Sequence, residues 1–124
     1  MILYAAADLI WASRIKGVAD SLEVPARPAR DLAMLEARLA DCQICGMIVD
    51  LDKESDAIDL IRRLRDQRAT PAQREIRIVA FGPHVRRDLL QQAREAGADE
   101  VLTRGTFDHG LDVILLRLAG RADA

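Results

Sequence analysis

The chain alternates between short apolar runs and stretches with helical spacing. The segments predicted as strands are 2–7, 24–29, 44–50, 76–81 and 100–103. The first is continuously apolar, which is typical of a strand covered on both faces of a parallel sheet. The second holds Pro25 and Pro28, and because proline cannot donate to a strand ladder, we expect this strand at a sheet edge.

Between these segments, apolar residues recur at intervals of three and four, which predicts amphipathic helices. Asp8 and Asp31 suit the N-caps of the first two helices, Ser55 or Asp56 the third, and Gly97 the residue that ends the fourth. The fourth helix is predicted over about 85–96 and the last over 111–118. The polar segment 65–75 is predicted as the longest loop. The side chains expected to face inward are Trp11, Ile15, Val18, Leu22, Leu32, Leu35, Leu39, Ile58, Ile61 and Leu64.

Five strands alternating with five helices predict a single α/β domain over residues 1–124, with helices on both faces of a parallel sheet in a three-layer αβα arrangement. Right-handed crossovers and an edge position for the second strand favour the flavodoxin-like (βα)5 strand order 2-1-3-4-5. Ligands approach such sheets at the carboxyl ends of the strands. We therefore expect function at that edge.

Composition excludes several classes of function. The formal charge is -2, so the chain offers no broad cationic field for a nucleic-acid backbone. The apolar opening is much shorter than a signal or membrane-spanning segment. No Walker loop or glycine-rich dinucleotide fingerprint is present. We expect a cytoplasmic protein with no cofactor, no nucleic-acid partner and no membrane contact.

Two segments carry a resemblance to a known family. They are MIVDL at 47–51 and AREAGADEVLTR at 93–104. Together with the predicted order of elements, they resemble the response-regulator receiver (CheY-like) family over nearly the whole chain. The resemblance implies that Asp50, at the end of the third strand, stands at the phosphoacceptor position. It also implies that Arg104 stands where receivers have a lysine.

Other positions depart from the receiver pattern. Ala6 and Ala7 stand where receivers carry an acidic pair, with only the neighbouring Asp8 retained. Gly82 replaces the serine or threonine at the end of the fourth strand, and Gly105 replaces a proline. A carboxylate is a weak nucleophile, so phosphoryl transfer to Asp50 needs bound magnesium, which in turn needs several oxygen ligands. The pattern predicts a pseudo-receiver.

Three other groups of residues are candidate sites. Asp8, Asp50 and Asp52 are the candidate ligands for a divalent cation, although acids at the start of a helix are expected from capping and the helix dipole alone, so we expect no resident metal. Cys42 and Cys45 form a C-x-x-C spacing without further zinc ligands nearby, and we expect two buried or partly buried thiols.

The third group is His84 and His109, which share the carboxyl edge with Asp8 and Asp50. A small enzyme using either histidine therefore stays an alternative, and it predicts a deep pocket at that edge.

The last predicted helix carries more apolar residues than one core-facing stripe requires. The resemblance makes this helix a candidate homodimer surface through Leu111, Ile114, Leu115 and Leu118; burial by the chain itself is the alternative. We expect a stand-alone pseudo-receiver that acts in signal transduction through contact with a regulatory protein, and not an enzyme. A divergent phosphoacceptor using Asp50 is the second hypothesis.

Overall fold

The computed structural model describes residues 1–52 and 54–121. Its elements, in chain order, are β1 (Ile2–Ala5), α1 (Leu9–Ser21), β2 (Ala26–Pro28), α2 (Leu32–Asp41), β3 (Gly46–Asp50), α3 (Glu54–Arg65), α4 (Pro71–Arg74), β4 (Arg77–Gly82), α5 (Arg87–Ala96), β5 (Glu100–Thr103), α6 (Arg104–His109) and α7 (Leu111–Leu118). The strands form one parallel sheet in the order β2-β1-β3-β4-β5. The predicted fold class, strand order and edge position of the proline-bearing strand are confirmed.

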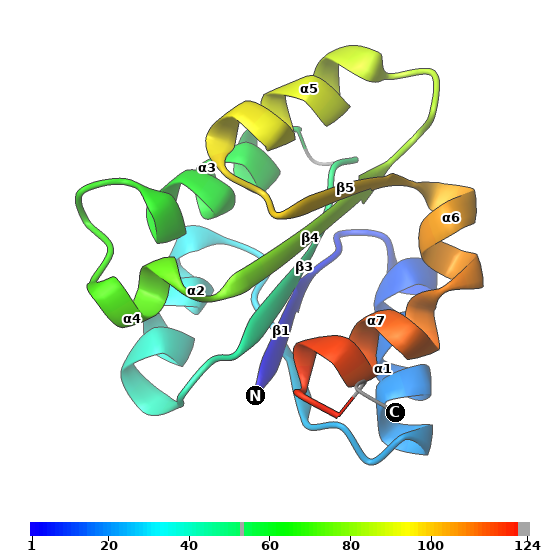
Figure 1. The fold of residues 1–124 in the computed structure, drawn as a ribbon, viewed down its shortest axis with the longest axis horizontal. Coiled ribbons are helices and arrows are strands. Elements are labelled where there is room, and N and C mark those ends of the chain that lie inside the picture. The colour runs from blue at the N-terminus through cyan, green and yellow to red at the C-terminus, as the bar shows by residue number, and fades with distance from the viewer. Residues whose placement is uncertain (53, 122–124) are drawn as a thin grey trace.

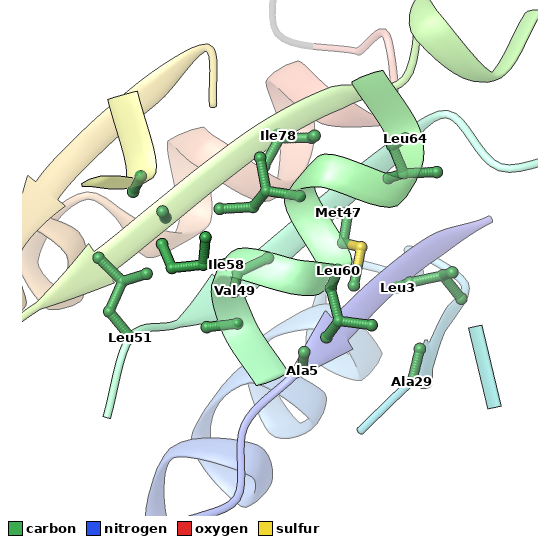
Figure 2. Close-up of a cluster of buried hydrophobic side chains, with 14 of the residues drawn as sticks. Leu3, Ala5, Ala29, Met47, Val49, Leu51, Ile58, Leu60, Leu64 and Ile78 are labelled. Carbon is green, nitrogen blue, oxygen red and sulfur yellow. The ribbon is translucent and has the colours of Figure 1, made fainter. Parts of the chain in front are cut away.

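Helices cover both faces of the sheet (Figure 1). Helices α2, α3 and α5 lie over one face, and α1, α6 and α7 lie over the other. Successive residues of β3 and β4 enter opposite layers. Met47 and Val49 pack toward α3, as Figure 2 shows for that core, whereas Ile48 packs toward α1 and α7. This two-sided burial explains why the strands are apolar runs without polar alternation.

Two helices were not expected from the sequence. Segment 65–75 contains α4, which Thr70 caps in a capping box with Gln73, and Pro71 occupies its first turn. The Thr-Pro-x-Gln pattern is a known start signal that the prediction of a loop overlooked. Helix α6 is also additional and is capped by Thr103, whose hydroxyl accepts a hydrogen bond from Thr106 N.

Two local predictions on the other helices are wrong. Helix α3 begins at Glu54, so Ser55 and Asp56 lie inside its first turn and neither is its N-cap. Leu32, the first residue of α2, is 37% exposed, so its predicted burial is wrong, whereas Leu35 is fully buried in the same helix.

The final helix is a core element. Its four residues Leu111, Ile114, Leu115 and Leu118 are at most 6% exposed, and they pack with Ile15 and other residues under α1. Helix α7 approaches β3 so closely that a Cβ at Gly46 would lie 3.0 Å from Leu118. The prediction that these four side chains form a homodimer surface is therefore wrong, because the chain itself buries them.

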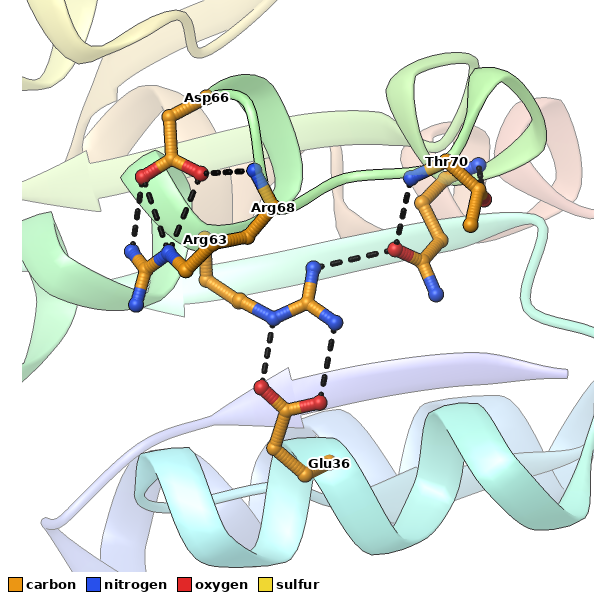
Figure 3. Close-up of polar contacts among 6 residues, drawn as sticks. Glu36, Arg63, Asp66, Arg68 and Thr70 are labelled. Atoms are coloured by element: carbon orange, nitrogen blue, oxygen red, sulfur yellow. Dashed lines mark hydrogen bonds and ion pairs between the residues drawn. The ribbon is translucent and has the colours of Figure 1, made fainter.

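A polar cluster joins three helices on the opposite face (Figure 3). The guanidinium of Arg63 in α3 donates two hydrogen bonds to the Glu36 carboxylate in α2, at 2.5 and 3.0 Å, and one to the Gln73 side chain in α4 at 3.0 Å. The hydrogen bonds from Arg63 hold the pKa of Glu36 below its usual value. This cluster is structural, since every donor and acceptor named here is directed at another helix.

The end of α3 is fixed by Arg65. Its guanidinium donates to the carbonyl oxygens of Gly97, Arg74 and Ile76 at 2.8–3.0 Å, and to the Asp99 carboxylate at 2.8 Å. Asp99 also accepts a hydrogen bond from Ile78 N at 2.7 Å. Gly97 ends α5 in the left-handed conformation, with φ of 115°. The Gly-Ala-Asp turn is thus explained by packing and hydrogen bonding alone.

Within the two described stretches of chain, no helix combines the length and apolarity needed to cross a bilayer.

Candidate functional site

The carboxyl edge of the sheet gathers the residues that the sequence singled out. Asp50 ends β3 directly opposite Phe81 of β4, and Thr103 ends β5 opposite Gly82. Asp8 precedes α1, and Arg104 begins α6. The charges of Asp8, Asp52 and Arg104 all act on Asp50. The parallel sheet therefore brings four predicted residues into one electrostatic neighbourhood.

The carboxyl group of Asp50 is buried, and the residue is only 2% exposed. Its Oδ1 accepts a hydrogen bond from Asp52 N at 3.1 Å, whereas its Oδ2 is buried and has no hydrogen-bond partner among the described residues. Burial raises the pKa of Asp50 to about 6, and the negative charges of Asp52 and Asp8 add to the rise. The hydrogen bond from Asp52 N–H and the positive charge of Arg104 act to lower this pKa. With a pKa of about 6, this carboxyl is mostly ionised near neutral pH, and its protonated fraction rises as the pH falls toward 6.

Arg104 is paired with Asp52. Its Nη2 forms an ion pair with Asp52 Oδ2, which joins the start of α6 to the loop after β3. The Arg104 Nε is buried without a hydrogen-bond partner among the residues described. Asp52 is therefore occupied by a cation that the chain itself supplies.

The remaining positions at this edge do not fit a magnesium ion. Asp8 accepts a hydrogen bond from Ile10 N at 2.7 Å, which confirms its prediction as the cap of α1. Ala6 and Ala7 contribute methyl groups where carboxylates would be needed. Over residues 1–52 and 54–121, no three His, Cys, Asp or Glu side chains come together as a metal site. With Asp52 paired to Arg104 and Asp8 capping α1, a hard cation would lack the several oxygen ligands it requires.

Gly82 packs tightly against its neighbour across the strand. A Cβ at this position would lie 3.1 Å from the Cβ of Leu51, which is fully buried. A serine or threonine here would require a small shift of Leu51. The hydroxyl that the resemblance leads one to expect is absent.

The histidines and cysteines do not extend this site. His84 and His109 are both exposed, in the loop after β4 and at the end of α6. Cys42 is half-buried as expected, but Cys45 is exposed, so the prediction of a covered thiol is wrong there. Cys45 directly precedes β3, where the chain enters the sheet at its amino edge, and both thiols are free.

One feature near the site was missed from the sequence. Phe81 and Phe107 stack with ring centroids 3.9 Å apart, and Trp11 packs at a tilt against both rings. The three side chains come from β4, α6 and α1. Their positions have no common spacing, so only the folded topology could bring them together. The cluster places the chain's single tryptophan against the strand beside Asp50.

Comparison with solved structures identifies the fold. No protein-family profile and no curated protein sequence matches the chain. Several solved structures match it. A signal receiver domain of a response regulator from Bermanella marisrubri is 25% identical, with a TM-score of 0.77 over 94% of this chain and 95% of that one. The signal receiver domain of a histidine kinase from Syntrophus aciditrophicus is 22% identical, with a TM-score of 0.79 over 98% and 91%.

This chain has the receiver-domain fold of response regulators. A third similar structure is the receiver domain of a sensor histidine kinase from Pseudomonas aeruginosa, which is 18% identical with a TM-score of 0.77 over 96% of each chain. That receiver domain holds a magnesium ion in its active-site cleft. The similar structures are signalling domains, which agrees with the prediction that the present receiver-like chain is not an enzyme.

Proposed function

We propose that this chain is a pseudo-receiver, a signalling domain that regulates a partner protein by contact and does not take part in the phosphorylation cycle. The observation that carries the proposal is the pairing of Asp52 with Arg104, beside alanines at positions 6 and 7. The receiver fold supports a role in signal transduction regulation. The pairing at its carboxyl edge supports the further proposal that the chain is not a phosphoacceptor.

Phosphoryl transfer to a carboxylate depends on neutralising charge. The incoming group is anionic, and catalysis rests on positioning and on metal ions that offset the negative charge of its oxygens. Asp50 has the right place at the end of β3, and with a pKa of about 6 its carboxyl is mostly ionised near neutral pH. With Asp8 capping α1, Asp52 paired with Arg104 and alanines at positions 6 and 7, the edge offers too few free oxygen ligands for the metal that the reaction needs.

The absence of a hydroxyl side chain at position 82 also supports the proposal that the chain does not take part in phosphorylation. Gly82 has no side chain to contact a phosphoryl group on Asp50, and Leu51 fills the adjacent space. A modification at Asp50 would therefore have no side chain at this position through which to reorganise β4. This supports the proposal that the chain acts by contact with a partner through a fixed surface. A homodimer stays possible as a prediction only through residues other than the four core side chains of α7.

A divergent phosphoacceptor is the second candidate. It is favoured by one observation, the free Oδ2 of Asp50, which is an unpaired carboxyl oxygen at the expected position. In that case Asp8, Asp50 and Arg104 would have to suffice for the chemistry, with Asp52 replacing a lost ligand. This would require Asp52 to leave its ion pair.

A phosphodonor experiment tests the proposal. The protein is incubated with acetyl phosphate and magnesium, and its intact mass is measured by mass spectrometry beside a receiver domain that has a complete acidic pair. We expect the control domain to gain a phosphoryl group and this chain to stay unmodified. Stoichiometric labelling that disappears in the Asp50→Asn variant would overturn the proposal in favour of the second candidate.

A further inference from the structure

We infer that Arg104 is the resident cation of the carboxyl edge, and that its ion pair with Asp52 closes this edge to divalent metal ions. The inference rests on the proposed function, since it explains how the edge is stabilised once magnesium is no longer used. It assigns a specific role to Arg104, which the comparison with receivers alone would describe only as a replacement for their lysine.

The position of Arg104 is set by its local structure. It is the first residue of α6, immediately after the cap residue Thr103 at the end of β5. From there its guanidinium reaches across the edge to Asp52, two residues after the end of β3. The ion pair is about one-third exposed on each side. Both of its charges act on the buried Asp50.

The charges around Asp50 favour a cation at this edge. Three carboxyl groups act here, those of Asp8, Asp50 and Asp52, and Arg104 is the positive side chain that acts on Asp50. Mutual repulsion of such a group is relieved either by a bound cation or by protonation. Arg104 meets this need from within the chain. A divalent ion could use Asp52 only by displacing the guanidinium.

The ion pair between Arg104 and Asp52 leaves two buried polar atoms of the site without hydrogen-bond partners. Asp50 Oδ2 and Arg104 Nε are both buried without a hydrogen-bond partner among the described residues. Asp50 is 98% removed from solvent, so its free oxygen lies inside the site. The carboxyl oxygen of Asp50 lacks a donor or a cation, and the N–H at Arg104 Nε lacks an acceptor. Removing the arginine would therefore leave an acidic edge with one carboxyl oxygen ready to bind a metal.

The test measures magnesium binding to four proteins. The wild type is compared with Arg104→Gln and Arg104→Met, which remove the charge, and with Arg104→Lys, which retains it. Magnesium chloride is titrated at constant ionic strength, and binding is followed by the fluorescence of Trp11, which packs against Phe81 beside the site, and by the rise in melting temperature. Circular dichroism confirms that each variant is folded.

We expect Arg104→Gln and Arg104→Met to bind magnesium at least tenfold more tightly than the wild type, and Arg104→Lys to behave as the wild type does. Adding Asp50→Asn to Arg104→Gln should abolish the gain. The inference is overturned if both charge-removing variants are folded and bind no more tightly than the wild type, or if the wild type binds equally well. Either failure leaves the phosphodonor result unaffected, so the proposed function is judged separately.

Discussion

Replacing Arg65 with methionine is expected to lower the free energy of unfolding by about 2–4 kcal/mol, although the residue lies far from the carboxyl edge. Its side chain is only 18% exposed and donates to three carbonyl oxygens and one carboxylate. Methionine retains most of the apolar packing but leaves those acceptors without their charged donor. Urea unfolding followed by circular dichroism measures the change.

Arg62 supplies the matched control for this experiment. It lies on the same helix and is exposed, so Arg62→Met should change the free energy of unfolding by less than about 0.5 kcal/mol. Equal effects of the two substitutions would contradict the role given to Arg65.

Replacing Asp50 with asparagine is expected to stabilise the protein at pH 8 by about 1–3 kcal/mol and to have little effect near pH 4. The pKa of Asp50 is raised from 3.8 in an unperturbed group to about 6 in the folded protein. The full shift corresponds to about 3 kcal/mol, and water at the mouth of the edge reduces it. The measurement is urea unfolding of both proteins across this pH range.

The direction follows from proton linkage. Because folding raises the pKa of Asp50, the folded state binds the proton more tightly than the unfolded state. The stability that this group contributes is fully present below pH 3.8 and is lost as the pH rises through about 6. Asparagine removes the cost of burying the charge, so its benefit appears only at the higher pH.

Asp59 is the control for the chemical change itself. It is exposed on α3, and Asp59→Asn should alter stability by less than about 0.5 kcal/mol at both pH values. An Asp50→Asn protein that is no more stable than the wild type at pH 8 would mean that the buried carboxylate is compensated. A metal ion or a closer approach of Arg104 would then have to be part of the site.

The architecture could be predicted from the sequence because the central strands are buried on both sides. The apolar runs at 44–50 and 76–81 and the helical spacing between the strands predicted the alternation of strands and helices, and right-handed crossovers limited the sheet order. The edge strand was placed by its prolines alone. The final helix was harder, because an excess of leucines does not reveal whether another helix of the same chain covers them. Here α1 and the sheet do so.

The sequence predicted which residues lie at the site but not which of them form an ion pair. Sequence order and the parallel sheet put Asp8, Asp50, Asp52 and Arg104 at one edge. Which acid would take the arginine depended on the start of α6, a helix that the hydrophobic pattern did not predict. The burial of Asp50 likewise depends on the side chains of neighbouring strands. Neither is contained in local spacing.

The most direct test of the account is to follow the Asp50 carboxyl group itself by carbon-13 NMR, with and without magnesium. The central claim is that this aspartate keeps the position of a phosphoacceptor while lacking the metal that would activate it. The account predicts a pKa near 6 that does not change when magnesium is added at millimolar concentration. A pKa that falls by one unit or more in the presence of magnesium would show a cation bound beside Asp50 and contradict the account.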